Sequence, residues 1–325
     1  MTTSERDKPY PSLPEGAEYV TKPRLPRVSL RVMLKTSPTL RRAVPTRLLL
    51  ARSERKVRRL WASHEGTRRY WLATMESIVA GTDRADELEQ LALAQVIERD
   101  AWDTLFWQPW EPLLLDEQSR ERILAPISAG RAVILSACHT GPFFHRSVTL
   151  YSIGAYVAVV AGDFWFEPPS SDMWGRRLAR WHRDVPELPV TRPKGSFNVL
   201  RELLAERIPL LLYFDMPGRH ETRFLGRPAM MVDGTARLAV DAEAVVVPIR
   251  VHREGHHVRE EAFEPLDAND FAGVDELHQA LADVHSRLIL EYPQEMSAPS
   301  EFGWGDGATT EIWRRPSVGS DQGTR

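Results

Sequence analysis

The sequence predicts an α/β fold: a mostly parallel central sheet flanked by helices and preceded by a basic helical N-terminal region. Short apolar runs alternate with amphipathic segments from about residue 117 onward, which is typical of the strands and helices of a parallel sheet. Prolines and basic residues are concentrated near the N-terminus instead. The chain of 325 residues is 42% apolar and 27% charged, a globular composition that excludes collagen-like, coiled-coil and wholly disordered proteins.

The first 70 residues are predicted to form an extended arm that leads into a helix. Six prolines fall within residues 1–38, and proline interrupts helices. Apolar residues then recur at intervals of three and four over 45–61, 67–79 and 83–99, the spacing of amphipathic helices. We therefore divide the chain into residues 1–70 (basic arm and helix), 71–295 (α/β domain) and 296–325 (flexible tail).

Strands and helices alternate in the second part of the chain. The run from Ala132 to Ala137 is almost entirely apolar, as expected of a strand that is buried on both faces. Gly130 ends the helix before this run, and Gly255 marks a hairpin turn further on. We expect helices over 117–128, 143–153, 197–207 and 274–291, and strands over 132–137, 155–160, 210–214 and 244–251.

Positive charge is concentrated in one segment. Residues 22–69 contain fifteen Lys and Arg against two Glu, a net charge of +13 in a chain whose total is −3. This asymmetry indicates a polyanionic partner such as a phosphate backbone, an anionic membrane or an acidic carrier protein. The alternative is that the segment packs against the acidic remainder of its own chain. The candidate polyanion-binding residues are Arg55, Lys56, Arg58 and Arg59.

Composition also limits the compartment and the cofactors. The single cysteine, Cys138, excludes a disulfide framework and a cysteine-rich metal site. His139 and His145 lack a third ligand at metal-binding spacing, so we expect neither a metal nor a cofactor. The uncharged stretch 147–162 is shorter than the ~20 apolar residues of a membrane-spanning helix, and the N-terminus does not resemble a signal peptide. We expect a cytoplasmic protein, either soluble or bound peripherally at the inner face of the membrane.

Three tryptophans, Trp102, Trp107 and Trp110, fall within nine residues. They would line an apolar ligand channel, rest on a membrane surface or pack into the domain core. Because tryptophan contributes a large apolar area when buried, the sequence favours the core.

Two polar residues follow predicted strands. His139 follows the strand 132–137, and Asp215 follows the strand 210–214. The carboxyl ends of parallel strands meet at one edge of an open α/β sheet, where reactive residues gather. His139 at such an edge can take a proton from a hydroxyl or amine that attacks an acyl carbon; a structural role is the alternative. Cys138 is expected to point to the opposite face from His139, as a small buried residue rather than a thiol nucleophile.

Six segments of this domain form a recognisable series, which reads GRAVILSACHTGPFF (130–144), VTRPKG (190–195), LLLYFD (210–215), ETRFLGRPAM (221–230), GTARLA (234–239) and VVVPI (245–249). In order and spacing the series resembles the motifs of the lysophospholipid acyltransferase superfamily. Within this superfamily, the series looks most like the branch that includes the bacterial lipid A late acyltransferases and the mycobacterial phosphatidylinositol mannoside acyltransferase.

The resemblance implies a glycerolipid-acyltransferase-like fold and a histidine general base that deprotonates an acceptor for attack on an acyl donor. On this mapping His139 is the base. Glu221 matches a carboxylate near the pocket of the mycobacterial branch, and Asp215 is the third candidate catalytic residue. Arg192 lies where the family has a basic residue near its polar substrate. The candidate substrate-binding residues are Arg192, Lys194, Phe144, Gly226 and Arg237.

The chain departs from the family in two places. The family motif is His, four residues, then Asp or Glu, whereas this sequence has Phe144 at the last position. Because that carboxylate orients the imidazole and stabilises its charged form, we expect Glu221, Asp215 or Asp163 to replace it. The C-terminal end also differs, since the Trp- and His-bearing end of the lipid A enzymes is replaced by YPQEMS at 292–297.

These features support three hypotheses. The first is an acyltransferase that uses a thioester of acyl carrier protein or coenzyme A and acts on a lipid, a sugar or a specialised metabolite. The second is a transferase whose donor is a charged tRNA and whose acceptor is an amine or hydroxylamine, for which a weakened base would suffice. The third is a non-catalytic lipid- or RNA-binding relative.

Overall fold

The computed structural model describes residues 10, 12–19, 37, 41, 43–108, 114–161, 175–180, 189–192 and 195–297. Its strands are β1 (Ala17–Tyr19), β2 (Leu114–Leu115), β3 (Val133–Ala137), β4 (Ala158–Val160), β5 (Pro189–Thr191), β6 (Leu210–Tyr213), β7 (Pro217–Phe224), β8 (Arg227–Met231), β9 (Val245–Glu254), β10 (His257–Ala262) and β11 (Leu266–Asp267). Its main helices are α3 (Thr46–Ser63), α4 (Glu65–Val79), α5 (Leu88–Phe106), α6 (Glu117–Ser128), α7 (Arg146–Ser152), α9 (Ser196–Ala205), α10 (Gly234–Asp241) and α11 (Val274–Glu291), with short 3-10 turns that include η3 (Phe143–His145) and η6 (Pro293–Glu295).

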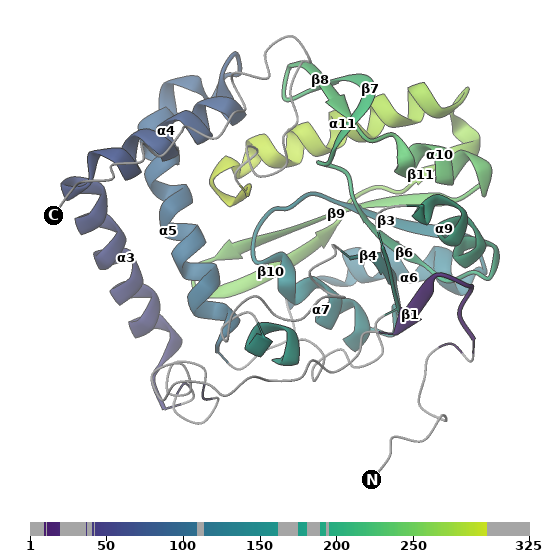
Figure 1. The fold of residues 1–325 in the computed structure, drawn as a ribbon, viewed down its shortest axis with the longest axis horizontal. Coiled ribbons are helices and arrows are strands. Elements are labelled where there is room, and N and C mark those ends of the chain that lie inside the picture. The colour runs from purple at the N-terminus through teal and green to yellow at the C-terminus, as the bar shows by residue number, and fades with distance from the viewer. Residues whose placement is uncertain are drawn as a thin grey trace, which may run out of the picture.

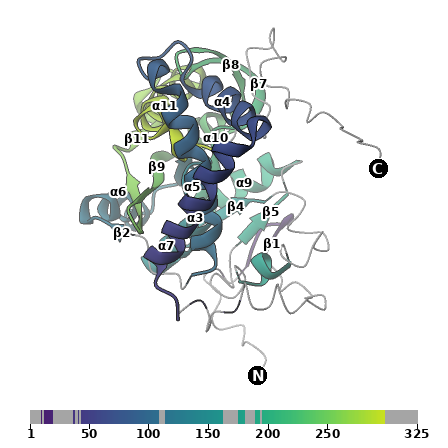
Figure 2. The same ribbon diagram turned by 90° about the vertical axis from the view of Figure 1, so that its left-hand side faces the viewer.

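The central sheet has the strand order β1-β5-β4-β6-β3-β9-β10-β2, with β11 also paired to β9 (Figures 1 and 2). The five neighbours β5, β4, β6, β3 and β9 run parallel. Within the described part of this central sheet, antiparallel pairs occur only beside these five strands, where β1 joins β5 and where β10 and β11 join β9. The predicted α/β fold with a mostly parallel central sheet is confirmed.

Strand β3 illustrates how the sheet is buried. Side chains alternate between the two faces of a strand, and both faces of β3 are apolar. Val133 and Leu135 pack on the face covered by α6 and α7, whereas Ile134 packs on the face covered by α9, α10 and α11. The polar residue in this strand, Ser136, lies 2.9 Å through its Oγ from Nε2 of His285 in α11. The Ser136 hydroxyl therefore has a hydrogen-bond partner inside the core.

Helices α3, α4 and α5 form a separate layer at one end of the sheet, nearest the viewer in Figure 2. The buried side chains of α3 are Ser53, Val57 and Trp61, four residues apart and hence on one face of the helix. This face packs against α5. Helix α5 continues to Phe106, beyond the predicted limit at residue 99, so Trp102 belongs to its last turns and is buried.

Strands β7 and β8 form a two-stranded hairpin apart from the central sheet. Gln279 of α11 attaches this hairpin, because its Oε1 accepts the Thr222 hydroxyl and the Arg223 backbone N–H, both at 3.0 Å. The sequence patterns predict neither this hairpin nor the strands β1 and β5. Both of these strands have three residues, too few for an alternating pattern to be read.

Three buried histidines predict a loss of stability in acid. Burial lowers the pKa of His145 to about 3 and those of His278 and His285 to about 4. The unfolded chain binds protons at these sites from about pH 6.5, so the stability that the neutral histidines contribute is present above pH 6.5 and is lost as the pH falls toward 4. Neither ring nitrogen of His278 has a hydrogen-bond partner among the described residues. We therefore expect His278→Leu to reduce the loss of unfolding free energy between pH 7 and pH 5 by about 2 kcal/mol.

Urea unfolding at the two pH values measures this difference. His257→Leu, at an exposed position of β10, is the control and should leave the pH dependence unchanged. An identical pH dependence in wild type and His278→Leu would contradict the prediction.

Candidate active site

The candidate site lies where two neighbouring parallel strands end. Strands β3 and β6 pair directly, with Ala137 beside Tyr213, so His139 and Asp215 follow at the same edge of the sheet. Nδ1 of His139 lies 2.9 Å from Oδ1 of Asp215, and the other carboxylate oxygen accepts the backbone N–H of His139 at 2.9 Å. The structure thus brings together two of the three candidate catalytic residues.

This contact assigns different roles to the two nitrogens of His139. The Asp215 carboxylate is fully buried, whereas the imidazole retains 14% of its exposed surface. A carboxylate at Nδ1 favours the tautomer that carries its proton there, which leaves Nε2 as the nitrogen able to accept a proton. Such an arrangement suits a general base.

Aromatic rings hold the plane of the imidazole. Tyr213 stacks on His139 with ring centres 4.0 Å apart and 17° between planes, and Phe143 meets it edge-on at 5.3 Å. Behind Tyr213, the guanidinium of Arg146 lies 5.8 Å from the tyrosine ring centre and donates from Nε to Glu260 at 3.1 Å. Both members of this ion pair are fully buried, and burial raises the pKa of Glu260 to about 7 against the opposing charge of Arg146. The histidine therefore rests on a rigid, buried support.

The loop after β3 has no room for a side chain at Gly141. Its φ of +61° lies in the left-handed region that favours glycine. A Cβ at this position would lie 2.2 Å from the carbonyl oxygen of Val251 in β9. Strand β9 thus supports the loop that carries His139.

We expect Gly141→Ala to destabilise the protein and displace this loop. The matched control is Gly130→Ala, because Gly130 has a similar φ of +70° but nothing within 4 Å of its missing Cβ. The control should cost about 1–2 kcal/mol for the left-handed backbone alone, and Gly141→Ala should cost clearly more. Chemical unfolding measures both, and equal losses would show that the contact with Val251 is unimportant.

The structure does not bring the remaining catalytic candidate to His139. Glu221 lies exposed on β7 of the separate hairpin. Gly226 lies in the turn of the same hairpin, and Arg237 lies on α10 with its guanidinium 5.3 Å from the ring centre of Phe197. Among the described residues, no hydrogen bond or ion pair joins any of these three candidates to His139.

Of the remaining predicted catalytic and substrate-binding residues, only Arg192 has a described side chain. Arg192 is exposed and follows the carboxyl end of β5, at the same edge as His139. Strands β4 and β6 separate β5 from β3, a spacing of about 14 Å at ~4.8 Å per strand. Lys194 and Asp163 lie outside the described residues, and only the backbone of Phe144, in η3, is described.

The residues that support the His139 ring, Tyr213 and the pair of Arg146 and Glu260, are not among the predicted site residues. Tyr213 could have been found, because it precedes Asp215 by two residues and therefore shares its face of the strand. The pair of Arg146 and Glu260 had no such signal, since the two residues are 114 positions apart.

The four basic candidates are exposed on α3: Arg55, Lys56, Arg58 and Arg59. Lys56 contacts Asp100 at 2.6 Å, and Arg58 contacts Glu54 at 2.7 Å. The other two have no acidic partner in the part of the chain that the structure describes. Half of the candidate set is therefore paired within the chain, and the other half is exposed without an acidic partner among the described residues.

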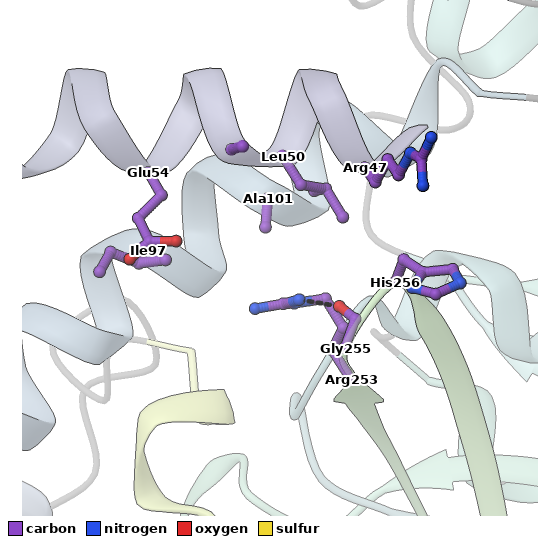
Figure 3. A pocket seen from close by; sticks show the side chains of 9 residues that line it. Arg47, Leu50, Glu54, Ile97, Ala101, Arg253, Gly255 and His256 are labelled. Carbon is purple, nitrogen blue, oxygen red and sulfur yellow. Dashed lines mark hydrogen bonds between the residues drawn. The ribbon is translucent and has the colours of Figure 1, made fainter. Parts of the chain in front are cut away.

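A cavity of about 230 Å³ lies between α3, α5 and the turn after β9 (Figure 3). Neither His139 nor Asp215 lines it. Apolar side chains from the two helices meet Arg253 and His256 there; the full lining is Arg47, Leu50, Ala51, Glu54, Ile97, Ala101, Arg253, Gly255 and His256. Arg253 forms an ion pair with Glu98 of α5, and this ion pair joins β9 to α5 at one wall of the cavity.

Other expectations concern Cys138 and the tryptophans. Cys138 is buried on the face covered by α9, α10 and α11, and burial raises the pKa of its thiol well above its usual range. Trp102 and Trp107 are buried, and Trp110 lies outside the described residues. Over the described ranges, no cluster of three or more His, Cys, Asp or Glu side chains could hold a metal ion, and none of the helices there is long and apolar enough to cross a membrane.

Comparison with known proteins adds a relative. The chain is 28% identical over 191 residues to phosphatidylinositol mannoside acyltransferase of Mycolicibacterium smegmatis, which covers 56% of this chain and 60% of that protein. The chain is related to the acyltransferase superfamily. The relationship predicted from the six motifs is thereby confirmed, although the chain matches less than two thirds of the length of this relative.

Comparison with family models and with solved structures gives two further results. No family model matches the chain. The crystal structure of the 1-acyl-sn-glycerophosphate acyltransferase of Thermotoga maritima aligns with 77% of this chain and 98% of its own, at 15% identity and a TM-score of 0.38.

Proposed function

We propose that this chain is an acyltransferase in which His139 is the general base and Asp215 orients it. The observation that carries the proposal is the double contact from Asp215, which meets both Nδ1 and the backbone N–H of His139 at 2.9 Å. A buried carboxylate at Nδ1 can orient the ring and stabilise its charged form, as in a hydrolase triad. Asp215 would thereby replace the carboxylate that the family motif has at the position of Phe144.

The reaction follows from this arrangement. Nε2 of His139 takes the proton of the acceptor as its oxygen or nitrogen attacks the acyl carbon of a thioester. Asp215 stabilises the imidazolium that forms. When the tetrahedral intermediate collapses, the C–S bond breaks and the proton of the imidazolium passes to the leaving thiolate. The products are the acylated acceptor and a free thiol, and His139 is neutral again.

The contact between His139 and Asp215 affects which acceptor groups the enzyme can activate. A histidine without a carboxylate would favour an amine or hydroxylamine, which are strong nucleophiles, but a histidine oriented by Asp215 can also activate a hydroxyl group. The relative from Mycolicibacterium smegmatis is named for a mannoside acceptor. We therefore infer a hydroxyl acceptor on a lipid or sugar, with acyl carrier protein or coenzyme A as the carrier of the acyl group.

A thiol-release assay tests this proposal. Acyl-coenzyme A and acyl carrier protein thioesters of several chain lengths are offered with lysophospholipids, lipid mannosides or hydroxylamine as acceptors. Acceptor-dependent release of thiol that His139→Ala lowers by at least about a hundredfold would support the proposal. Binding of a thioester without any release would favour the non-catalytic alternative.

One observation favours a charged tRNA as an alternative donor. Arg52, Arg55 and Arg59 are exposed on α3 at positions that share one face of the helix. None of the three has an acidic partner among the described residues. Such a row of arginines suits a phosphate backbone.

A salt titration of tRNA binding distinguishes this alternative. Removing three phosphate contacts by the triple change of Arg52, Arg55 and Arg59 to Gln should reduce the slope of log K against log salt by about 2 to 3. The double change of Lys56 and Arg58 to Gln is the control, because both side chains already pair within the chain. Absence of binding at moderate salt would leave the thioester donors.

We also propose a cytoplasmic location with peripheral contact at the inner face of the membrane. Helix α3 supports this, because Leu48 is 55% exposed and Leu60 is 39% exposed beside its arginines, a combination that suits an anionic lipid surface. Sedimentation with vesicles of phosphatidylglycerol against vesicles of phosphatidylcholine tests the contact, and equal recovery with both would contradict it.

A further inference from the structure

Residues 295–297 form a short strap along the loop that carries His139. The backbone N–H of Gly141 donates to the carbonyl of Glu295 at 2.8 Å, and the N–H of Ser297 donates to the carbonyl of His139 at 2.8 Å. The residues between them pair as an antiparallel bridge. All three residues of the strap are buried. The loop is thus hydrogen-bonded along its length to a segment more than 150 positions later in the chain.

The other side of the strap contacts helix α5. The side-chain amide of Gln95 donates to the carbonyl of Met296 at 2.7 Å, and Trp102 donates from Nε1 to Oε2 of Glu295 at 3.1 Å. Both donors are buried. The strap therefore lies between the helical layer and the loop and is hydrogen-bonded to both.

Glu295 is the side chain on which these contacts converge. Its second carboxyl oxygen accepts the backbone N–H of Arg253 at 3.0 Å, and Arg253 extends from there to the wall of the cavity in Figure 3. Burial, and then the negative charge of Glu98, raise the pKa of Glu295 to about 8. A carboxyl group in such a place is costly unless it is hydrogen-bonded, and the reaction at His139 does not use it directly. The Glu295 carboxyl group instead accepts hydrogen bonds from Trp102 in α5 and from the backbone of Arg253 in β9.

We propose that Glu295 is a positioning residue that fixes the loop of His139 through the strap 295–297. Asp215 holds the N–H of His139 and Ser297 holds its carbonyl, so the peptide groups on both sides of the imidazole are restrained. A displacement of about 1 Å at a reacting group can cost about a hundredfold in rate. This inference rests on the proposed role of His139 as the base, and it assigns the second departure from the family motifs, at 292–297, a role in the site.

Glu295→Gln is the direct test in the full chain. Glutamine has the same shape but offers one acceptor oxygen, so its NH₂ group must face either the indole N–H or the Arg253 N–H. We expect the strap to shift and kcat to fall about 10- to 100-fold, with KM changed by less than about threefold, because the strap lies behind the loop rather than at the substrate. An NMR titration of the His139 imidazole should show an altered pKa or tautomer in this variant.

Two controls separate positioning from stability. Leu277→Val removes one methylene from the buried face of α11 and lowers the unfolding free energy by about 1 kcal/mol without touching the strap. Glu76→Gln changes an exposed carboxylate on α4. Both should leave kcat and the His139 titration unchanged. A Glu295→Gln variant that behaves like Leu277→Val, less stable but with the kcat and the titration of wild type, would overturn the proposal.

A second variant covers the case in which Glu295→Gln does not fold. Gln95→Met keeps the volume of the side chain but removes the donor to Met296, and it should lower kcat in the same direction; unchanged kcat and titration in this variant would likewise overturn the proposal. The NMR titration needs no substrate. If wild type transfers no acyl group from any donor but the titration still shifts in Glu295→Gln, the positioning role stands and the proposed reaction fails.

Discussion

Replacing His139 with alanine should lower acyl transfer by about a hundredfold to ten-thousandfold, the range that a positioned general base contributes. The substitution also removes one hydrogen-bond partner of the fully buried Asp215 carboxylate, so we expect some loss of stability in addition to the loss of activity. The loss should fall on kcat, because Nε2 acts on the proton that moves in the transition state. Single-turnover thiol release with the best thioester donor measures it.

Binding is the control for this variant. The affinity of His139→Ala for the acyl donor should stay within a few-fold of wild type, and assays well below its unfolding midpoint separate the loss of turnover from any loss of stability. Wild-type turnover in His139→Ala would refute the assignment of the base. Equal binding with no turnover in either protein would instead favour a binding module without catalysis.

Replacing Asp215 with asparagine should lower kcat by about three to four orders of magnitude, as the equivalent change does in serine proteases. The backbone N–H of His139 is a donor at 2.9 Å, so the amide oxygen of asparagine must face it. The NH₂ group then faces Nδ1 and forces that nitrogen to accept. The proton of the imidazole moves to Nε2, which leaves no acceptor for the proton of the substrate.

Nitrogen NMR of the imidazole checks the tautomer directly, and the pH dependence of kcat checks its effect. Glu221→Gln is the comparison, because Glu221 lies exposed on the β7–β8 hairpin without a contact to His139 among the described residues. We expect full turnover in Glu221→Gln and a kcat about three to four orders of magnitude lower in Asp215→Asn. Full activity in both variants would show that no replacement carboxylate operates, and the reverse pattern would assign the role to Glu221.

Local patterns were sufficient for most of the fold. The run at β3 is apolar on both faces, and this predicts a buried central strand whatever surrounds it. The predicted helix at 274–291 coincides with α11, since its apolar residues recur with the period of one helix face. Three-residue strands such as β5 escaped prediction, because their existence depends on neighbours that they meet only after folding.

The sequence by itself determined the fold class, the relationship to acyltransferases and the place of His139 at the end of a strand. Each of these follows from residues near one another in the chain, whose periodicity and order are visible without coordinates. Only the tertiary structure decided that Asp215 rather than Glu221 meets the imidazole, and that Glu295 supports the loop. The reason is physical. The pairing of β3 with β6 brings Asp215 to His139, and hydrogen bonds between residues more than 150 positions apart bring Glu295 to the loop. Neither contact joins residues that are close in the sequence, so no local pattern predicts it.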